Sequence, residues 1–323
     1  MTGQSARDPR VRTIFIGSGG FGVESLRRLG SHDDVDLVGV VSAPPRPAGR
    51  KQEVTPTRIQ LAARELGIKT ILTPDRLRAP ESVADVLALR PELLVLADYG
   101  QIVPSELLEV KHGALNLHPS LLPHHRGATP IPAAILAGDA ETGVTLMRMD
   151  EGLDTGPIVA QERVPLLGTE TTPLLQEELA IRAADLLDRN LTPWIRGELE
   201  AKPQPGEGAT LTRPLRREDG RLDPRKSAVQ LERQVRAYQP WPGSFVDTPS
   251  GRILVWSASL GASGGPGMGI LDEHGLGVGD GTSLWFVEVQ PAGGRRMTWD
   301  SLLRGKPAIV GSSVLTPLPA SGD

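Results

Sequence analysis

The sequence contains no cysteine, which excludes disulfide bonds, thiolate metal ligands and cysteine nucleophiles and favours a reducing compartment. It has six histidines but no pair with the H-x-x-x-H spacing, so we expect no metal site. No apolar run approaches the roughly 20 residues that span a bilayer. The first ten residues are polar and lack the apolar segment of a signal peptide. We therefore expect a cytoplasmic protein without membrane contact, and no protein partner is evident.

The sequence also lacks a strong excess of either charge, with 35 Lys and Arg, 39 Asp and Glu, and a net charge of −4. This balance alone indicates neither a nucleic-acid coat protein nor a membrane-surface protein. One stretch differs, because residues 213–236 hold eight basic and four acidic side chains. Such a stretch is either a solvated surface or a face that contacts phosphates.

The pattern of apolar residues predicts an α/β domain over residues 1–200. Short apolar strands alternate with helical segments, which is typical of a parallel sheet covered on both faces. The expected strands are 11–16, 35–41, 69–72, 93–97, 114–117 and 144–149. The expected helices are 21–29, 57–66, 81–89 and 172–190.

The texture of the sequence changes near residue 200. Residues 201–212 are rich in proline and glycine and are expected to form a linker. After it, over residues 213–323, short β-like segments such as 251–256 and 283–289 are separated by glycine-rich turns. This pattern predicts a second, smaller domain built as a β-barrel or sandwich.

Residues 17–22, GSGGFG, fit the G-x-G-x-x-G pattern of dinucleotide-binding turns. Such a site also needs an acidic residue at the end of the second strand, to hold the ribose hydroxyls. Ser42 stands at that position, although Arg46 or Arg50 could serve a phosphorylated ribose. A tight strand-to-helix turn explains the glycines equally well, so an NADP-linked oxidoreductase is a remote alternative.

A candidate catalytic group lies further along the chain. Asn116 and His118 are two residues apart on a predicted strand that ends before Pro119, so both point to the same side. Asp154 lies in the glycine-containing loop after the strand 144–149. We expect the three side chains to meet at neighbouring strand ends, where α/β proteins place ligands. An amide, an imidazole and a carboxylate can stabilise an oxyanion and move a proton, which suits acyl transfer to an amine.

Several segments resemble the folate-dependent formyltransferases, among them NLHPSLLP, RGATPI and LAGDAETGVTLMRMDEGLDTG. The resemblance runs from about residue 11 to residue 303 and is strongest to the members that formylate initiator methionyl-tRNA. RPAGR resembles their tRNA-facing insert, and SAVQLERQVRAYQPWPGSF resembles the start of their second domain. The resemblance implies a Rossmann-like formyltransferase domain followed by a β-barrel of OB type.

The resemblance also implies roles for individual residues and names the substrates. The matching catalytic residues are Asn116, His118 and Asp154. The loop that would contact the formyl donor, 10-formyltetrahydrofolate, contains Ser120, Leu121, Leu122 and Pro123. The residues expected to bind initiator methionyl-tRNA are Arg46, Arg50 and Lys51, with further contacts from the second domain.

Other interpretations share part of this pattern. A formyltransferase for sugar nucleotides or glycinamide ribonucleotide would use the same three residues, and a non-catalytic folate- or RNA-binding module would use none of them. The sequence departs from the family pattern at three places, which are Asp98, His124–His125 and Gly19–Gly20. These departures adjoin the expected folate pocket or the glycine turn and leave the catalytic residues intact.

Overall fold

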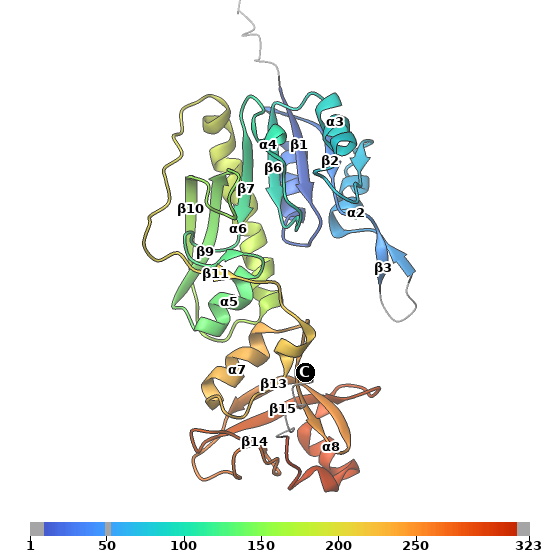
Figure 1. The fold of residues 1–323 in the computed structure, drawn as a ribbon, viewed down its shortest axis with the longest axis vertical. Helices are drawn as coiled ribbons and strands as arrows, with labels where there is room; N and C mark the ends of the chain where they lie inside the picture. Colours follow the sequence, from blue (N-terminus) through green and yellow to red (C-terminus); the bar gives the residue numbers. More distant parts are fainter. Residues whose placement is uncertain (1–9, 49–52, 315–323) are drawn as a thin grey trace, which may run out of the picture. The chain divides into compact units, whose positions relative to one another are not determined.

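The computed structural model describes residues 10–48 and 53–314 (Figure 1). The chain forms two compact units that are discontinuous in sequence. Unit 1 consists of Met1–Pro130, Glu141–Pro165 and Gln176–Arg213. Unit 2 consists of Ile131–Ala140, Leu166–Leu175 and Pro214–Asp323. No helix in the described part of the chain is both long and apolar enough to cross a membrane.

Unit 1 is built on a seven-stranded sheet with the order β10-β9-β7-β6-β1-β2-β5. Its strands are β1 (Val11–Gly17), β2 (Val35–Val41), β5 (Ile71–Leu72), β6 (Leu93–Ala97), β7 (Ala114–His118), β9 (Glu141–Arg148) and β10 (Ile158–Pro165). The first five are parallel to one another, β9 runs antiparallel to β7, and β10 runs antiparallel to β9. Every residue of β6 is buried, as expected for a strand with helices on both faces.

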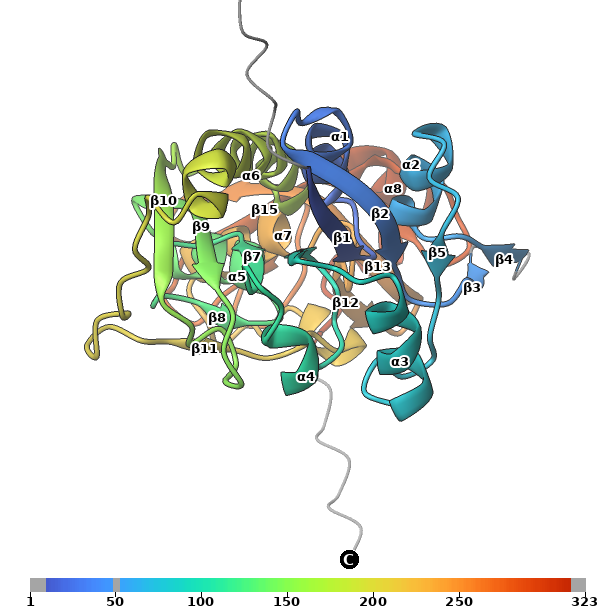
Figure 2. The same cartoon turned by 90° about the horizontal axis from the view of Figure 1, so that it is seen from above.

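Helices cover both faces of this sheet. They are α1 (Val23–Ser31), α2 (Arg58–Glu65), α3 (Pro80–Ala88), α4 (Ser105–Leu108) and α6 (Thr172–Ile195). Figure 2 shows α1 and α6 on one face and α3 and α4 on the other. Thr57 caps α2, because its hydroxyl accepts a hydrogen bond from the Gln60 N–H at 3.1 Å. The expected Rossmann-like α/β architecture is confirmed.

Unit 2 contains an antiparallel sheet with the order β12-β13-β15-β14, in which β16 also pairs with β15. Its elements are α5 (Pro130–Ala137), η1 (Arg217–Gly220), α7 (Ala228–Ala237), β12 (Ser244–Thr248), β13 (Gly251–Leu260), β14 (Gly275–Gly277), β15 (Ser283–Pro291), β16 (Met297–Thr298), α8 (Trp299–Gly305) and η2 (Pro307–Ile309). Within residues 10–48 and 53–314, no pairing joins β12 to β14. The sheet is therefore a curled half-barrel, consistent with the expected OB-like domain.

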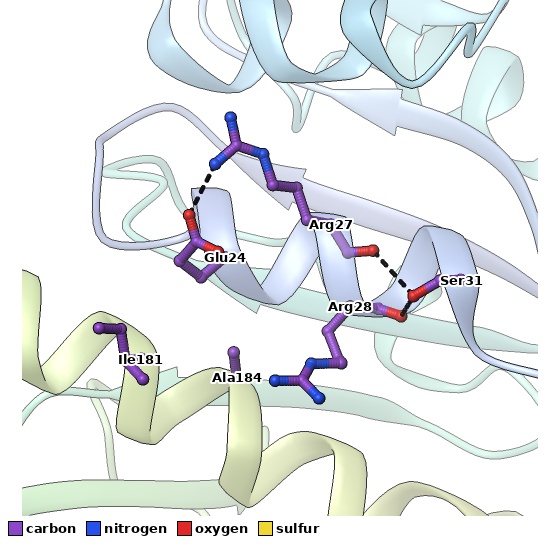
Figure 3. Close-up of a pocket in the computed structure, with 6 residues that line it drawn as sticks. All are labelled: Glu24, Arg27, Arg28, Ser31, Ile181 and Ala184. Atoms are coloured by element: carbon purple, nitrogen blue, oxygen red, sulfur yellow. Dashed lines mark hydrogen bonds and ion pairs between the residues drawn. The ribbon is translucent and has the colours of Figure 1, made fainter.

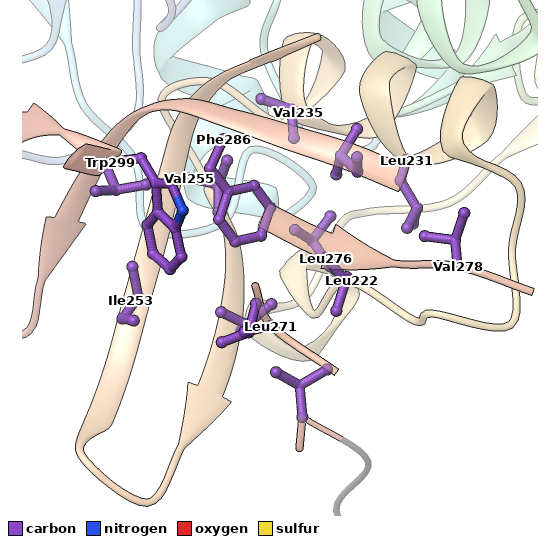
Figure 4. Close-up of a cluster of buried hydrophobic side chains, with 14 of the residues drawn as sticks. Leu222, Leu231, Val235, Ile253, Val255, Leu271, Leu276, Val278, Phe286 and Trp299 are labelled. Carbon is purple, nitrogen blue, oxygen red and sulfur yellow. The ribbon is translucent and has the colours of Figure 1, made fainter. Parts of the chain in front are cut away.

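The core of unit 2 explains why these short strands hold together. Phe286 and Trp299 meet edge to face with their ring centroids 5.1 Å apart. Aliphatic side chains from α7 and the sheet surround them, including Leu231, Val235 and Val255 (Figure 4). Along β15 buried and exposed residues alternate from Leu284 to Val287, as a strand with one covered face requires.

The boundaries between the two units do not coincide with the change in composition near residue 200. Helix α5 belongs to unit 2, where the Arg233 guanidinium donates to the Ala137 carbonyl at 2.9 Å. Residues 201–212, expected to form a linker, belong to unit 1. There β11 (Leu211–Thr212) pairs with β8 (Arg126–Gly127) as a two-stranded parallel sheet. The domain boundaries inferred from composition stay a prediction.

Candidate active site

His118 ends strand β7 and has only 4% of its surface exposed. Its Nε2 lies 2.9 Å from the backbone carbonyl oxygen of His125. Because a carbonyl can only accept a hydrogen bond, Nε2 carries the proton. In the neutral imidazole, Nδ1 is then free of hydrogen and faces the Asp154 carboxylate, with 3.6 Å between Nδ1 and Oδ2.

Asp154 lies in the loop 149–157 between β9 and β10. Its Oδ2 accepts a hydrogen bond of 2.7 Å from the Gly127 N–H, and its backbone has a φ of +51°. This φ lies in the left-handed region, which is uncommon for residues other than glycine. A Cβ on Gly156 would lie 2.0 Å from the Arg148 carbonyl oxygen, so the return of this loop requires a glycine.

The path by which Asp154 reaches His118 differs from the path expected from the sequence. Strand β9 is antiparallel to β7, so that His118 pairs with Thr145 and Leu115 pairs with Arg148. The loop 149–157 therefore leaves β9 at the amino end of β7 and folds back toward His118. The expectation of two parallel strand ends at one edge was wrong for β9, although the two side chains do meet.

Asn116 lies two residues before His118 on the same side of β7 and is half-buried. Its backbone pairs with Leu96 on β6 and Met147 on β9. Among the described residues its side-chain amide has no hydrogen-bond partner. The N–H groups of this amide are therefore available to a bound molecule.

Burial determines the charge state of the imidazole. It lowers the pKa of His118 below its usual value, and the nearby Asp154 carboxylate opposes this shift only in part. The charge of His125 adds to the lowering of the pKa. His118 is therefore neutral near pH 7, with its proton on Nε2 and a lone pair on Nδ1.

The loop 119–127 carries the residues expected to contact the formyl donor. Ser120, Leu122 and Pro123 are buried, and the Ser120 hydroxyl donates to the His124 carbonyl at 2.6 Å. Leu121 is half-buried and is the most accessible of the four. The structure thus gives three of them an internal role in the loop, and their contact with the donor stays a prediction.

A residue that sequence reasoning missed holds this loop in place. Thr145 on β9 is fully buried, and its hydroxyl donates to the Ser120 carbonyl at 2.7 Å. The same hydroxyl oxygen accepts from the Leu122 N–H at 3.1 Å and from Gln161 Nε2 at 2.9 Å. The sequence does not indicate this role for a threonine within an apolar strand, because the hydrogen-bond partners of Thr145 lie on other elements.

A pocket of about 400 Å³ lies beside these two loops. Its lining includes Arg126, Asp150, Thr155 and Gln204, together with three prolines. Within the described ranges, no group of three His, Asp or Glu side chains is arranged to hold a metal ion. The amide of Asn116, the imidazole of His118 and the carboxylate of Asp154 offer hydrogen bonding and proton transfer.

The glycine turn serves to pack the chain closely. A Cβ on Gly17 would lie 2.5 Å from the Ala97 carbonyl oxygen, and one on Gly19 would lie 1.5 Å from Asp98 Oδ2. Desolvation by this packing raises the pKa of Asp98, although the residue keeps an exposed surface. Ser42 is fully buried and shares a 2.6 Å hydrogen bond with the Thr57 hydroxyl. Nothing acidic therefore stands where a dinucleotide ribose would bind.

The basic residues expected to bind tRNA are only partly described. Arg46 is exposed on β3 (Arg46–Ala48), which forms a hairpin with β4 (Glu53–Thr55). Arg50 and Lys51 lie outside the described residues. In the stretch 213–236, ion pairs within unit 2 engage three arginines, which are Arg221, Arg225 and Arg236. These pairs reduce the positive field that composition alone suggests.

A second pocket lies on unit 1 between α1 and α6 (Figure 3). Its arginines already have partners, because Arg27 pairs with Glu24 at 2.7 Å and Arg28 pairs with Asp185 at 2.7 Å. Neither His118 nor Asp154 lines it. The pocket of about 400 Å³ lies nearer the candidate chemistry, because Arg126 of the loop 119–127 and Asp150 and Thr155 of the loop 149–157 line it, although His118 and Asp154 are not among its lining residues either.

Comparison with known proteins agrees with this fold. The formyl transferase model matches residues 11–190, and the model of the formyl transferase C-terminal domain matches residues 214–307. A solved N-formyltransferase from Helicobacter canadensis, in complex with folinic acid and dTDP-3-aminofucose, superposes with a TM-score of 0.62. That structure is 19% identical in sequence, and the match covers 85% of this chain and 98% of the other.

Relatives of higher identity extend over both units. The methionyl-tRNA formyltransferase of Chloroflexus aggregans is 42% identical over 302 residues, which cover 91% of this chain and 97% of the relative. That of Gluconacetobacter diazotrophicus is 44% identical over 309 residues, which cover 94% of this chain and 99% of the relative. On these grounds the chain belongs to the formyltransferase family and, within it, to the methionyl-tRNA formyltransferases.

Proposed function

We propose that this protein transfers the formyl group of 10-formyltetrahydrofolate to the α-amino group of methionine on initiator tRNA. The observation that carries the proposal is the arrangement at β7. The unpartnered amide of Asn116 lies beside a buried His118, whose Nδ1 is 3.6 Å from the Asp154 carboxylate. The similarity to methionyl-tRNA formyltransferases over both units supports the choice of substrates. Such a role in translation initiation implies a cytoplasmic location.

Each of the three side chains has a separate task in this reaction. Asn116 donates a hydrogen bond to the formyl oxygen, which becomes an oxyanion when the amine nitrogen bonds to the formyl carbon. The lone pair on His118 Nδ1, together with the Asp154 carboxylate, accepts a proton from the attacking amine. The same proton is returned to N10 of the folate as the bond between the formyl carbon and N10 breaks. The histidine and aspartate therefore end in their starting protonation states.

The hydrogen bond at Nε2 restricts which nitrogen can act. Since Nε2 is occupied by the His125 carbonyl, proton transfer takes place on the Nδ1 side of the ring, next to Asp154. The low pKa of His118 keeps Nδ1 unprotonated near neutral pH, when it is needed as a base. Burial and a backbone carbonyl thus prepare the imidazole for its role.

The acceptor is proposed to be held by positive charge from both units. Arg46 is exposed on the β3–β4 hairpin, and Arg216 and Arg217 are exposed at the start of unit 2. Guanidinium groups contact phosphates well because their fork of donors matches the phosphate oxygens.

One assay tests the proposal against its alternatives. The protein is incubated with 10-formyltetrahydrofolate and charged initiator methionyl-tRNA, and formylmethionine is quantified after hydrolysis of the ester. A parallel reaction contains a dTDP-linked amino sugar, and a third contains NADPH with no formyl donor. Formylation of the tRNA alone supports the proposal. Formylation of the sugar but not of the tRNA would assign the same chemistry to another acceptor and overturn it.

A further inference from the structure

Residues 201–212, here called the strap, contact both loops of the active site. Gln204 makes the central contacts, because its Nε2 donates to the carbonyl oxygens of Asp154 and Gly156, each at 2.8 Å. Its Oε1 accepts from the Arg126 guanidinium, at 2.6 Å from Nη2 and 3.1 Å from Nε. One half-buried side chain thus connects the loop 149–157 to the loop 119–127.

The far end of the strap holds the other partner of His118. The Thr210 hydroxyl accepts a hydrogen bond of 2.7 Å from the His125 N–H, and the Thr210 carbonyl accepts from the Arg126 N–H at 2.9 Å. The pairing of β11 with β8 continues this attachment. His125 is the residue whose carbonyl oxygen pairs with Nε2 of His118. Thr210 therefore supports this hydrogen bond indirectly, by holding His125 in place.

The two residues held by the strap share an unusual backbone conformation. Asp154 has a φ of +51° and His125 a φ of +56°, and neither is glycine. A side-chain-bearing residue stays in this left-handed region only where its surroundings fix it. Gln204 supplies such a contact at Asp154, and Thr210 supplies one at His125. A segment that only joined two domains would need neither.

We propose that the strap positions the active site, with Gln204 fixing Asp154 and Thr210 fixing His125 so that the His118 imidazole keeps both of its partners. Gln204 and Thr210 are positioning residues, because they act through Asp154 and His125 and not on the substrates. The inference rests on the proposed roles of His118 and Asp154. It adds to that proposal a requirement for residues that lie 50 and 85 positions away in the chain from the residues they serve.

Two substitutions test the two ends of the strap separately, and in each the new side chain is close in size to the one it replaces. Gln204→Met removes both donors to the loop 149–157, and Thr210→Val removes the acceptor for the His125 N–H. Thr210→Ser keeps that acceptor and serves as the rescuing variant. Glu207→Gln, an exposed change within the strap, controls for any disturbance of the segment as such.

Formylation of initiator methionyl-tRNA is measured for each full-length variant. We expect kcat to fall about 10- to 100-fold in Gln204→Met and in Thr210→Val, because displacing a catalytic group by about 1 Å costs up to 10²-fold. KM should change less than twofold, since neither side chain binds substrate. Thr210→Ser and Glu207→Gln should stay within twofold of the wild-type kcat.

A second measurement does not depend on activity. The imidazole of His118 is titrated by NMR, with its resonance assigned by its loss in His118→Gln. The charged or titratable groups that act on it are Asp154, which raises its pKa, and His125, whose backbone hydrogen bond raises the pKa while the charge of its ring lowers it. If Gln204→Met lets Asp154 move away, the pKa of His118 should fall, whereas a purely structural role would leave it unchanged.

The outcomes separate this inference from the proposed function. A wild-type protein that fails to formylate the tRNA would overturn the proposed function, and the titration would still show whether the strap holds Asp154. A wild-type protein that is active, with both Gln204→Met and Thr210→Val within twofold in kcat and with an unchanged His118 titration, would overturn the inference. Should Gln204→Met fail to fold, the kcat of Thr210→Val decides whether the inference holds. Thr210 is exposed, so we expect this variant to fold.

Discussion

At the scale of single residues, the half-buried amide of Asn116 is the part of the proposed chemistry that has no partner within residues 10–48 and 53–314. Its N–H groups have no partner in the described part of the structure, so their hydrogen bonds become available only to a bound molecule. A donor of this kind stabilises the charge that develops in the transition state more than it stabilises the bound substrate.

We predict that Asn116→Ala lowers kcat about 10²- to 10³-fold, the usual cost of losing one oxyanion donor. The matched control is Asn190→Ala, which removes an amide that instead donates to the Leu186 carbonyl within α6. Steady-state formylation assays compare the two variants. Equal activities in the two would remove Asn116 from the proposed mechanism.

The Asp154 carboxylate should also be visible in the titration of its neighbour. The carboxylate raises the pKa of His118 against the stronger effect of burial, so Asp154→Asn should lower that pKa further. The neutral imidazole would then persist to lower pH than in the wild type. NMR titration measures the shift, and Asp150→Asn, a change within the same loop, should leave the pKa of His118 unchanged. A rise in the pKa after Asp154→Asn would contradict the geometry.

At the scale of the elements, the residue that caps α2, Thr57, makes two hydrogen bonds. The Thr57 hydroxyl accepts from the Gln60 N–H and also pairs with the hydroxyl of buried Ser42. Thr57→Ala should therefore destabilise the protein by roughly 1–3 kcal/mol, from the lost cap and from the unpaired hydroxyl of Ser42. Thr57→Ser keeps the oxygen and should cost less. Urea unfolding measures both, and equal stability of the alanine variant and the wild type would show that the cap contributes nothing.

Strand β15 offers a direct comparison of its two faces. Phe286 is buried against Trp299, whereas its neighbour Val287 is 48% exposed. Phe286→Ala should lower the free energy of unfolding of unit 2 by about 3–5 kcal/mol. Val287→Ala should change it by about 0.5 kcal/mol or less. The unfolding transition followed by tryptophan fluorescence distinguishes them, and similar losses in both would mean that the strand does not have one covered face.

Sequence periodicity predicts most of the elements of unit 1, because buried parallel strands are continuous apolar runs. Strands β2 and β6 begin and end where the pattern places them. Strand β10 escapes detection because it is an edge strand with the mixed sequence IVAQERVP, whose residues are mostly not buried. The direction of β9 escapes detection too, because an apolar run carries no sign of its orientation in the sheet.

The proposed catalytic residues are easier to find than their supports. Asn116 and His118 are two positions apart on one strand, which a sequence shows directly. Thr145, Gln161 and Gln204 act through hydrogen bonds to backbone atoms of distant loops. Such partners depend on the tertiary structure alone, and the residues themselves are common polar types.

At the scale of the whole molecule, the proposed substrate is a polyanion and the protein carries a net charge of −4. Binding must then depend on local groups of basic residues, and each phosphate contact releases counterions. We predict that the affinity for initiator tRNA falls steeply between low and moderate salt. Filter binding over a range of salt concentrations measures the slope. An affinity that does not change with salt would exclude phosphate contacts as its source.

The strap has a further consequence for how a protein of this kind can change over evolutionary time. Since residues 201–212 are bound to the loops 119–127 and 149–157, they belong with the catalytic unit even though they lead to unit 2. An exchange of the second domain between formyltransferases would preserve the catalytic geometry only if the crossover falls after Arg213. A crossover at the change of composition near residue 200 would give the protein a new second domain together with a mismatched strap.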